Sequence, residues 1–313
     1  YPAVAAHPGQ GSVASCGMSL LRRVARRVLR RHRSVPAATP AAAPAAWAGS
    51  AVSPWAVVAP RTAAPNACLV CRWEGEYTDG WHAEFATCPQ CGSVARDRFL
   101  LWCYISRNPE QLGVRLLETS PRMGEAYRTA MGRWFDYLCS DYDLSAHKGV
   151  VQLDLQAIAR PDASFDVILT THVLEHVPDT GAALREIYRV LAPGGRMYLQ
   201  VPLLQGHTAP PTTPEFHGDN TPVFWRFGFD LVDHLRAVGF QTSLLCTAEW
   251  LHTVRSGATD WPTRCSQEFD VASMLAAARV DDLVAVADDA AAARFGFLPA
   301  YMHLTWECVK PLA

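Results

Sequence analysis

Residues 164–179 read SFDVILTTHVLEHVPD and residues 184–201 read LREIYRVLAPGGRMYLQV, and these two runs decide the fold. Residues 165–170 and 197–201 are apolar runs of strand length. Between them, apolar side chains recur with the spacing of one helix face, at Leu184, Ile187, Tyr188 and Leu191. The residues Pro193-Gly194-Gly195 are expected to stop this helix. A strand, a crossover helix and a second strand predict a parallel sheet.

The same alternation extends over residues 112–250. Short apolar runs predict further strands over 114–117, 134–140, 149–153 and 240–245, and helical spacing resumes over 229–238. Strands that alternate with helices are typical of a parallel sheet covered on both faces. The sequence therefore predicts a doubly wound α/β domain.

Three of the predicted strands are followed by a carboxylate, namely Glu118, Asp141 and Asp154, and a fourth by Thr171-His172. In an open α/β sheet, ligands bind beyond the carboxyl ends of the strands. Acids there accept hydrogen bonds from ribose hydroxyls and an exocyclic amine, and they disfavour a bare pyrophosphate. The chain has no Gly-x-Gly-x-x-Gly motif and no P-loop, so a nucleotide-like ligand without phosphates fits better. The alternative is that these acids are ordinary caps and turn residues.

Four of the ten cysteines form two Cys-x-x-Cys pairs, Cys68 with Cys71 and Cys88 with Cys91. This spacing is typical of a tetrahedral zinc site built from two knuckles. The short aromatic-rich segment between the pairs is too small to fold by burial alone, and zinc would supply the missing folding energy. Four thiolates close the site, so the zinc would be structural. Redox-active dithiols are the alternative interpretation.

The charge is unevenly distributed. Residues 1–60 hold seven arginines and no acid, which leaves a net charge of −9 on residues 61–313. An acidic body is a poor match for a phosphate backbone, so nucleic acid is disfavoured as the main partner. The remaining six cysteines are scattered, mostly in apolar runs, and the sequence shows neither a secretory signal nor a membrane-spanning helix. We therefore expect a cytoplasmic protein.

Residues 1–65 are predicted to be a disordered basic tail and an Ala/Pro-rich linker. Within them, residues 20–33 place apolar side chains on one helical face and arginines over the rest. Three interpretations stay open for this segment. It is a helix that contacts anionic lipid peripherally, an organelle transit segment, or a solvated tail whose like charges repel.

The run from Ser164 through the Leu174-Glu175-His176 segment to Gly195 closely resembles the class I S-adenosylmethionine-dependent methyltransferases, of the type 11-like kind. The resemblance covers roughly residues 112–250, and residues 301–309 are similar to the last, antiparallel strand of that family. It implies a Rossmann-like methyltransferase sheet with S-adenosylmethionine as the cofactor. The preceding four-cysteine module is similar to that of a branch of bacterial methyltransferases.

The resemblance also implies the cofactor-binding residues, strand end by strand end. After the first strand, the methionine part would lie against Glu118, Thr119 and Ser120. After the second, Asp141 would hold the ribose hydroxyls, with Tyr142 beside the adenine. The adenine edge would meet Asp154 and Leu155, and the loop after the fourth strand would line the cofactor through Thr171 and His172.

One departure from the family pattern concerns the first loop. The family usually has acid-x-Gly-x-Gly, whereas this chain has Glu118-Thr119-Ser120-Pro121-Arg122. Side chains at both glycine positions leave less room for close approach of the backbone to a ligand.

Candidate catalytic residues follow the fourth and fifth strands. His176 is one candidate general base, although the His172-x3-His176 motif is mainly structural, and a second metal lacks a third ligand with convincing spacing. Residues 205–226 form a long loop at the active end of the sheet, and it offers Glu215 and His217 as the first candidates. The alternative for this loop is a polar surface loop held down by its aromatic side chains. Arg96 and Arg98 are either substrate contacts or struts in salt bridges.

The sequence thus predicts three parts: residues 1–65, a zinc ribbon over 66–98, and a methyltransferase domain over 99–313 with an insertion at 251–300. Within the insertion, the Ala-rich acidic stretch 271–294 is expected to be helical, as a lid, a subunit contact or a plain surface insertion. The leading function is methyl transfer to a small-molecule acceptor, as an O-methylation. The alternatives are an RNA or protein methyltransferase that docks through the ribbon, and a non-catalytic binding protein with the same fold. The oligomeric state is not indicated.

Overall fold

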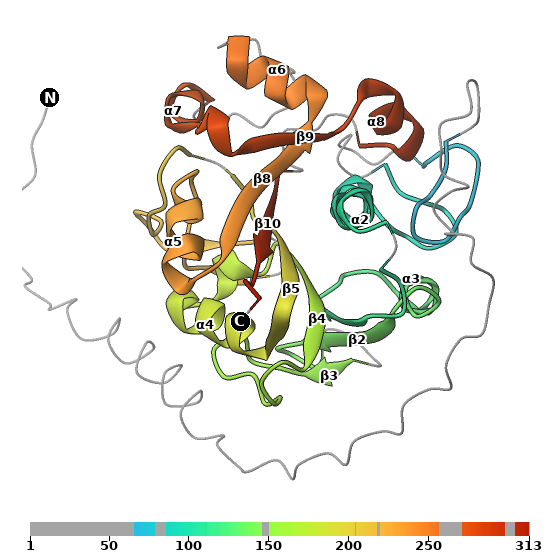
Figure 1. Cartoon of the computed structure of the whole chain (residues 1–313), viewed down its shortest axis with the longest axis horizontal. Helices are drawn as coiled ribbons and strands as arrows, with labels where there is room; N and C mark the ends of the chain where they lie inside the picture. The colour runs from blue at the N-terminus through green and yellow to red at the C-terminus, as the bar shows by residue number, and fades with distance from the viewer. Residues whose placement is uncertain are drawn as a thin grey trace, which may run out of the picture. The chain divides into compact units, whose positions relative to one another are not determined.

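One eight-stranded sheet organises the chain, in the order β3-β2-β1-β4-β5-β10-β8-β9 (Figure 1). In this sheet β10 runs antiparallel to both β5 and β8, and the other pairs are parallel. The computed structural model describes residues 66–78, 86–109, 111–145, 150–203, 205–217, 220–256, 271–297 and 304–312. The expectations for residues 1–65, the basic segment 20–33 included, lie outside the described residues.

The strands of the sheet are β1 (Arg115–Thr119), β2 (Asp136–Asp141), β3 (Val151–Gln152), β4 (Phe165–Thr171), β5 (Leu191–Gln200), β8 (Gln241–Thr247), β9 (Leu283–Ala287) and β10 (Thr305–Val309). A separate antiparallel hairpin consists of β6 (Glu215–Phe216) and β7 (Pro222–Val223). The helices are α2 (Ala95–Arg107), α3 (Glu125–Met131), α4 (Thr180–Val190), α5 (Leu231–Val238), α6 (Ala248–Ser256), α7 (Val271–Ala277) and α8 (Asp289–Phe295). Two short 3-10 turns are η3 (Leu174–His176) and η4 (Val280–Asp282). The doubly wound α/β fold and all six strands predicted over residues 112–250 are confirmed, with shifts at their ends.

The two faces of the sheet bury separate cores, because successive side chains of a strand point to opposite faces. Leu116 of β1 packs into the core under α2, α3 and α8, whereas Leu117 packs into the core under α4 and α5. Figure 1 shows these two groups of helices on opposite sides of the central strands. Both faces are therefore covered, as the apolar runs of the strands predict.

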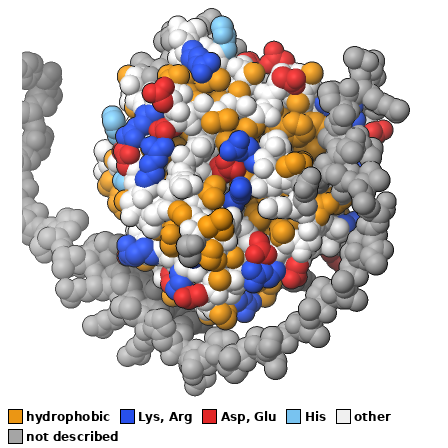
Figure 2. Space-filling view, viewed as in Figure 1, with side chains coloured by type: hydrophobic (Ala, Val, Ile, Leu, Met, Phe, Trp, Pro, Cys, Tyr) orange, Lys and Arg blue, Asp and Glu red, His pale blue; other side chains and the backbone are white. Residues whose placement is uncertain are grey.

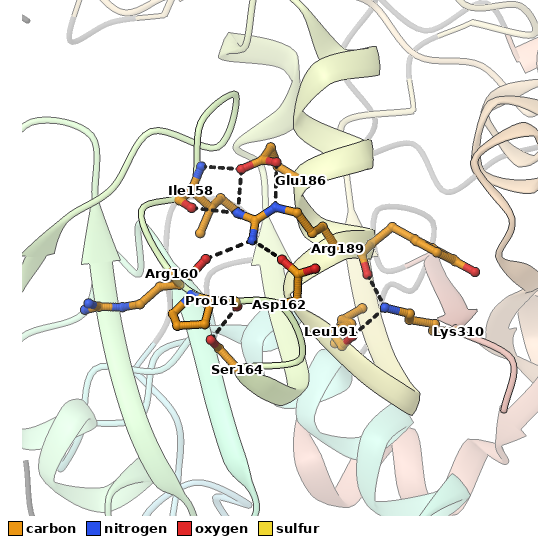
Figure 3. A network of polar contacts seen from close by, with 10 residues as sticks. Ile158, Arg160, Pro161, Asp162, Ser164, Glu186, Arg189, Leu191 and Lys310 are labelled. Atoms are coloured by element: carbon orange, nitrogen blue, oxygen red, sulfur yellow. Dashed lines mark hydrogen bonds and ion pairs between the residues drawn. The ribbon is translucent and has the colours of Figure 1, made fainter. Parts of the chain in front are cut away.

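An arginine on α4 anchors the loop that precedes β4 (Figure 3). Arg189 donates to the carbonyl oxygens of Ile158 and Arg160 at 2.8 and 2.9 Å, and to Asp162 Oδ1 at 2.7 Å. At the end of the same helix, Lys310 Nζ donates to the carbonyl oxygens of Tyr188 and Leu191. These bonds satisfy carbonyl groups that a helix end leaves without an intrahelical partner.

Two predictions about local structure are wrong. Helix α4 ends at Val190, before Pro193-Gly194-Gly195, and these three residues belong to β5 instead. A Cβ at Gly195 would lie 2.7 Å from the carbonyl oxygen of Ala192, so the close turn entering β5 requires a glycine there. The stretch 271–294 is not helical throughout, because it contains β9, which pairs in parallel with β8. Pairing with a distant strand overrides the helical preference of its alanines.

Candidate active site and metal centre

The polar strand ends predicted to bind a ligand lie at one edge of the sheet. In the parallel register, Thr119 of β1 is opposite Ser140 of β2 on one side and Thr170 of β4 on the other. The loops after β1, β2 and β4 therefore leave the sheet side by side. This is the position at which open α/β sheets bind ligands.

Ser120 and Asp141 join two of these loops. Ser120 Oγ donates to Asp141 Oδ2 at 2.8 Å, and the backbone N–H of Asp143 donates to Asp141 Oδ1 at 3.0 Å. Ser120 has φ of 47°, a left-handed conformation that glycine adopts without a steric cost. The residue at the first glycine position of the family pattern therefore keeps the conformation of a glycine, and its hydroxyl gains a bond to Asp141.

Glu118 is buried and engaged on both carboxyl oxygens. Tyr127 Oη donates to Oε1 at 2.9 Å, and Tyr137 Oη donates to Oε2 at 2.6 Å. Burial raises the pKa of Glu118 to about 7, against the opposing effect of the two tyrosine hydrogen bonds. The carboxyl is thus held toward α3 and β2.

The other residues expected to bind the cofactor are spread along the same edge. Tyr142 is 59% exposed and Leu155 is buried. Asp154 Oδ1 accepts the backbone N–H of Gln156 at 2.8 Å, which makes it a turn residue in this conformation. The His172 backbone, with φ of 53°, donates its N–H to the carbonyl oxygen of Gln200 at 2.9 Å.

A cavity of about 20 Å³ lies between the first turn of α2 and the loop after β1. Arg96, Asp97, Thr171 and residues 118–123 line it. Arg96 thus borders this cavity. Its charged lining is mixed, with the acids Asp97 and Glu118 and the bases Arg96 and Arg122. The space holds about one water molecule, so a ligand of cofactor size fits only if the loop after β1 moves outward.

Two of the three candidate general bases contact each other, and the third is bound by an arginine. His176 and His217 are in contact, with ring centroids 4.7 Å apart and ring planes at 88°. Glu215, by contrast, accepts a hydrogen bond from Arg226 Nε at 2.8 Å. The hairpin that carries His217 packs on η3, because the N–H groups of Phe224 and Trp225 both donate to the carbonyl oxygen of Glu175.

The four paired cysteines converge on one point. Their Sγ atoms all lie within 4.8 Å of one another, with 3.7 Å between Cys68 and Cys91 and 3.6 Å between Cys71 and Cys88. Zinc–sulfur bonds of about 2.3 Å in a tetrahedron place the sulfurs about 3.8 Å apart, so this set fits zinc. The hydrogen bond with Cys71 lowers the pKa of Cys68 to about 7, whereas hydrogen bonds with Cys68 raise the pKa values of Cys71 and Cys91. A metal needs the thiolate form of its ligands.

Arg98 ties the cysteine module to the sheet domain. Its guanidinium donates to the carbonyl oxygens of Ser93, Ala86 and Phe295, each at 2.7 Å, and lies 3.9 Å from the centre of the Tyr77 ring. It is fully buried. Arg98 is thus a strut, as expected, although it bonds to backbone carbonyls where a salt bridge was predicted.

Comparison with known proteins agrees with this architecture. Residues 94–241 match the family model of a methyltransferase domain. The ubiquinone biosynthesis O-methyltransferase of Idiomarina loihiensis is 32% identical over 92 residues, which are 29% of this chain and 33% of that protein. The arsenite methyltransferase of Aquipseudomonas alcaligenes is 30% identical over 103 residues, 33% of this chain and 28% of that protein. An S-adenosylmethionine-dependent methyltransferase of known structure from Mesorhizobium loti covers 52% of this chain and 92% of its own length, at 16% identity and a TM-score of 0.35.

The matching segments span a third or less of these two curated relatives. The match shows a methyltransferase domain over residues 94–241, and the sheet has the strand order of the class I S-adenosylmethionine-dependent methyltransferases. The family predicted from residues 164–195 is thereby confirmed. No helix in the described ranges combines the length and the apolar character that crossing a membrane requires.

Proposed function

We propose that this chain transfers a methyl group from S-adenosylmethionine to a small-molecule acceptor, as an O-methylation. The observation that carries the proposal is the single edge of a methyltransferase sheet at which three adjacent strands end, β1 just after Glu118, β2 at Asp141 and β4 at Thr171. Curated relatives that methylate small molecules, such as the O-methyltransferase of ubiquinone biosynthesis, support it.

Different residues at this edge would bind different parts of S-adenosylmethionine. Asp141 at the end of β2 offers a carboxylate to the ribose hydroxyls, with Tyr142 and Leu155 beside the adenine. Thr119 and Ser120 would lie against the methionine part, and Thr171 and His172 would also line the cofactor. When bound, S-adenosylmethionine supplies a methyl group on a positively charged sulfur, and the protein's contribution is to align it with the acceptor.

The acceptor side is built by η3 and the β6–β7 hairpin. His176 and His217 face each other there, and we assign the general base to His176. Glu215 supports the hairpin through Arg226. The zinc held by Cys68, Cys71, Cys88 and Cys91 is structural, and the reduced thiols suit a cytoplasmic location.

Two measurements test this function. Calorimetric titration of the zinc-loaded protein with S-adenosylhomocysteine should show one site per chain. Incubation with methyl-labelled S-adenosylmethionine and cell extract should then label a small molecule, which mass analysis identifies. Labelling of RNA or protein alone would contradict the small-molecule assignment.

A non-catalytic binding protein is the second candidate, and the 20 Å³ cavity behind side chains at both glycine positions favours it. Absence of binding in the titration would support this candidate against the enzyme.

An RNA methyltransferase is disfavoured by the net charge of −9 on residues 61–313. Figure 2 shows that acidic and basic side chains are intermixed on the face in view, with no broad basic patch among the described residues there.

A further inference from the structure

Glu175 is a buried carboxyl group without a hydrogen-bond donor in the part of the chain that the structure describes. It lies in η3, directly after the loop that leaves β4, and its side chain is 2% exposed. Neither Oε1 nor Oε2 accepts a hydrogen bond from the described residues. Burying a carboxyl in this way opposes folding, so its presence calls for a role other than stability.

The neighbouring histidine is held in a defined orientation. His176 Nδ1 lies 2.7 Å from the carbonyl oxygen of Pro222, and a carbonyl only accepts, so Nδ1 carries the proton. The basic atom of the neutral ring is therefore Nε2. Nε2 lies 3.7 Å from Glu175 Oε1, a distance at which a protonated imidazole and a carboxylate form an ion pair.

The β6–β7 hairpin fixes this pair from the other side. Pro222 belongs to β7, and His217 at the hairpin turn packs its ring at 88° against that of His176. Two further bonds from the hairpin, from the N–H groups of Phe224 and Trp225, end on the backbone of Glu175 itself. The β6–β7 hairpin and η3 are thus held together by hydrogen bonds and by the contact between the two histidine rings.

We propose that Glu175 is a positioning residue for the methyl transfer: its carboxylate holds the imidazolium that forms when His176 Nε2 takes the proton of the acceptor hydroxyl. This inference rests on the proposed function. A lone pair of the acceptor oxygen forms the new bond to the methyl carbon, and the electrons of the broken carbon–sulfur bond stay on sulfur. The hydroxyl proton passes to Nε2, so the charge lost from the sulfonium reappears on the imidazolium beside Glu175.

The charges around this pair come from several elements. Burial raises the pKa of Glu175 to about 8, while the positive charges of Arg96 on α2 and Arg122 after β1 act in the opposite direction. His217 faces the pair from the hairpin, and His172 precedes it on its own segment. While His176 is neutral, burial favours the protonated form of Glu175. Once His176 is protonated, the 3.7 Å separation between Nε2 and Oε1 favours the carboxylate of Glu175, because opposite charges at this distance stabilise each other.

The test compares four variants of the full chain in the reaction with the acceptor found by the extract experiment. Glu175→Gln keeps the shape of the side chain, His176→Asn keeps a donor toward Pro222, and His217→Phe keeps the ring contact. His234→Asn on the exposed side of α5 is the matched control. The measurements are kcat and KM against pH, and affinity for S-adenosylhomocysteine by calorimetry.

We expect Glu175→Gln to lower kcat by about 10–100-fold and to move the ascending limb of the pH profile to lower pH, because the imidazolium loses its counter-charge. His176→Asn should lower kcat by about 10²–10⁴-fold and abolish that limb, and His217→Phe should cost less than about tenfold. Affinity for S-adenosylhomocysteine should stay within about twofold in all variants. An unchanged pH profile in Glu175→Gln, or a parallel loss of cofactor affinity, overturns the proposal. So does a requirement for an added divalent cation that Glu175→Gln abolishes.

A second measurement needs no acceptor. Nitrogen NMR of histidine-labelled protein with S-adenosylhomocysteine should show His176 protonated on Nδ1, and Glu175→Gln should lower its pKa by about one unit. Protonation on Nε2, or the same pKa in both proteins, contradicts the inference. If S-adenosylhomocysteine does not bind or no acceptor is labelled, the proposed function fails, and the NMR titration still decides whether Glu175 controls His176.

Discussion

At the scale of single residues, two strained backbone conformations and two buried carboxyl groups lie close to the carboxyl ends of β1 and β4. Ser120 and His172 adopt left-handed conformations at φ of 47° and 53°. Glu118 and Glu175 are buried carboxyls whose pKa values burial raises to about 7 and about 8. Strain and raised pKa values gather at functional sites because stability alone would remove them.

Glu175 makes the folded protein less stable as the pH rises. Below its unfolded pKa of 4.5 the carboxyl is protonated in both states. Between pH 4.5 and 8 the unfolded chain releases the proton and the folded chain keeps it, so the free energy of unfolding falls as the pH rises through this window. Glu175→Gln should therefore be more stable than the wild type by on the order of 4 kcal/mol at about pH 8 and should match it near pH ~4.5. Urea unfolding at both values measures this, and exposed Glu125→Gln, which should show no such divergence, is the control.

Asp141 should matter for the cofactor more than its neighbours do. Asp141→Asn removes the charge that ribose hydroxyls would bind, so affinity for S-adenosylhomocysteine should fall roughly 10–100-fold with little change in stability. Asp143→Asn makes the same chemical change two residues away, where the carboxylate accepts the N–H of Ser145, and should leave the affinity unchanged. Equal losses in both variants, measured by calorimetry, would show that Asp141 does not contact the ligand.

At the scale of elements, the cysteine module builds part of the candidate active site. Ser93 Oγ lies 3.3 Å from the Sγ atoms of both Cys68 and Cys91, and α2 begins two residues later. Asp97 in the first turn of α2 accepts the backbone N–H of Val94 at 2.9 Å. That same turn lines the cavity with Arg96 and Asp97. The cavity wall is therefore connected to the four-cysteine cluster through Ser93 and the first turn of α2.

Loss of the metal should accordingly weaken both stability and cofactor binding. The wild type should bind one zinc ion per chain, and Cys88→Ser should lose it, with a drop in Tm of roughly 5–15 °C. Affinity for S-adenosylhomocysteine should fall as well, although Cys88 does not line the cavity. Cys139→Ser on β2 is the control and should keep the zinc. Metal analysis and calorimetry check this. Full affinity for S-adenosylhomocysteine in Cys88→Ser would show that cofactor binding does not depend on the metal.

At the scale of the whole molecule, residues 271–297 are part of the sheet domain and not an appendage. Strand β9 covers the outer edge of β8, and α8 supplies the carbonyl oxygen of Phe295 that Arg98 binds. Phe297 packs edge-on against Phe99 of α2, with ring centroids 5.3 Å apart. Residues far apart in the chain thus close the core on the side of the cysteine module.

Deletion of residues 271–297 should therefore yield an unfolded or insoluble protein, because it exposes the β8 edge and removes two carbonyl partners of buried Arg98. Deletion of residues 1–65 is the control, and it should change Tm by less than about 2 °C, since their Ala/Pro-rich composition and unbalanced arginines predict little burial. Circular dichroism and thermal unfolding compare the two. A folded protein without residues 271–297 would contradict the integral role of β9 and α8.

Periodicity in the sequence alone predicts the strands over residues 112–250, and the spacing of Cys68, Cys71, Cys88 and Cys91 predicts their cluster. Both are local patterns, since alternation and spacing reflect the geometry of nearby residues. The same holds for the acids at the strand ends, because parallel strands bring their carboxyl ends to one edge. The sequence by itself therefore determined the fold class, the family and the edge of the sheet at which the candidate site lies.

The tertiary structure decided which side chains meet. Residues 271–294 have a helical pattern, yet part of them forms strand β9, which pairs with β8. Glu175 shows no signal of its burial in the sequence, because its burial depends on a hairpin that follows much later in the chain. The sequence does not distinguish Glu215 from His217 as a candidate base. In the structure, Arg226 binds Glu215, and His176 contacts His217. Contacts between distant segments depend on packing and loop closure, which no local pattern encodes.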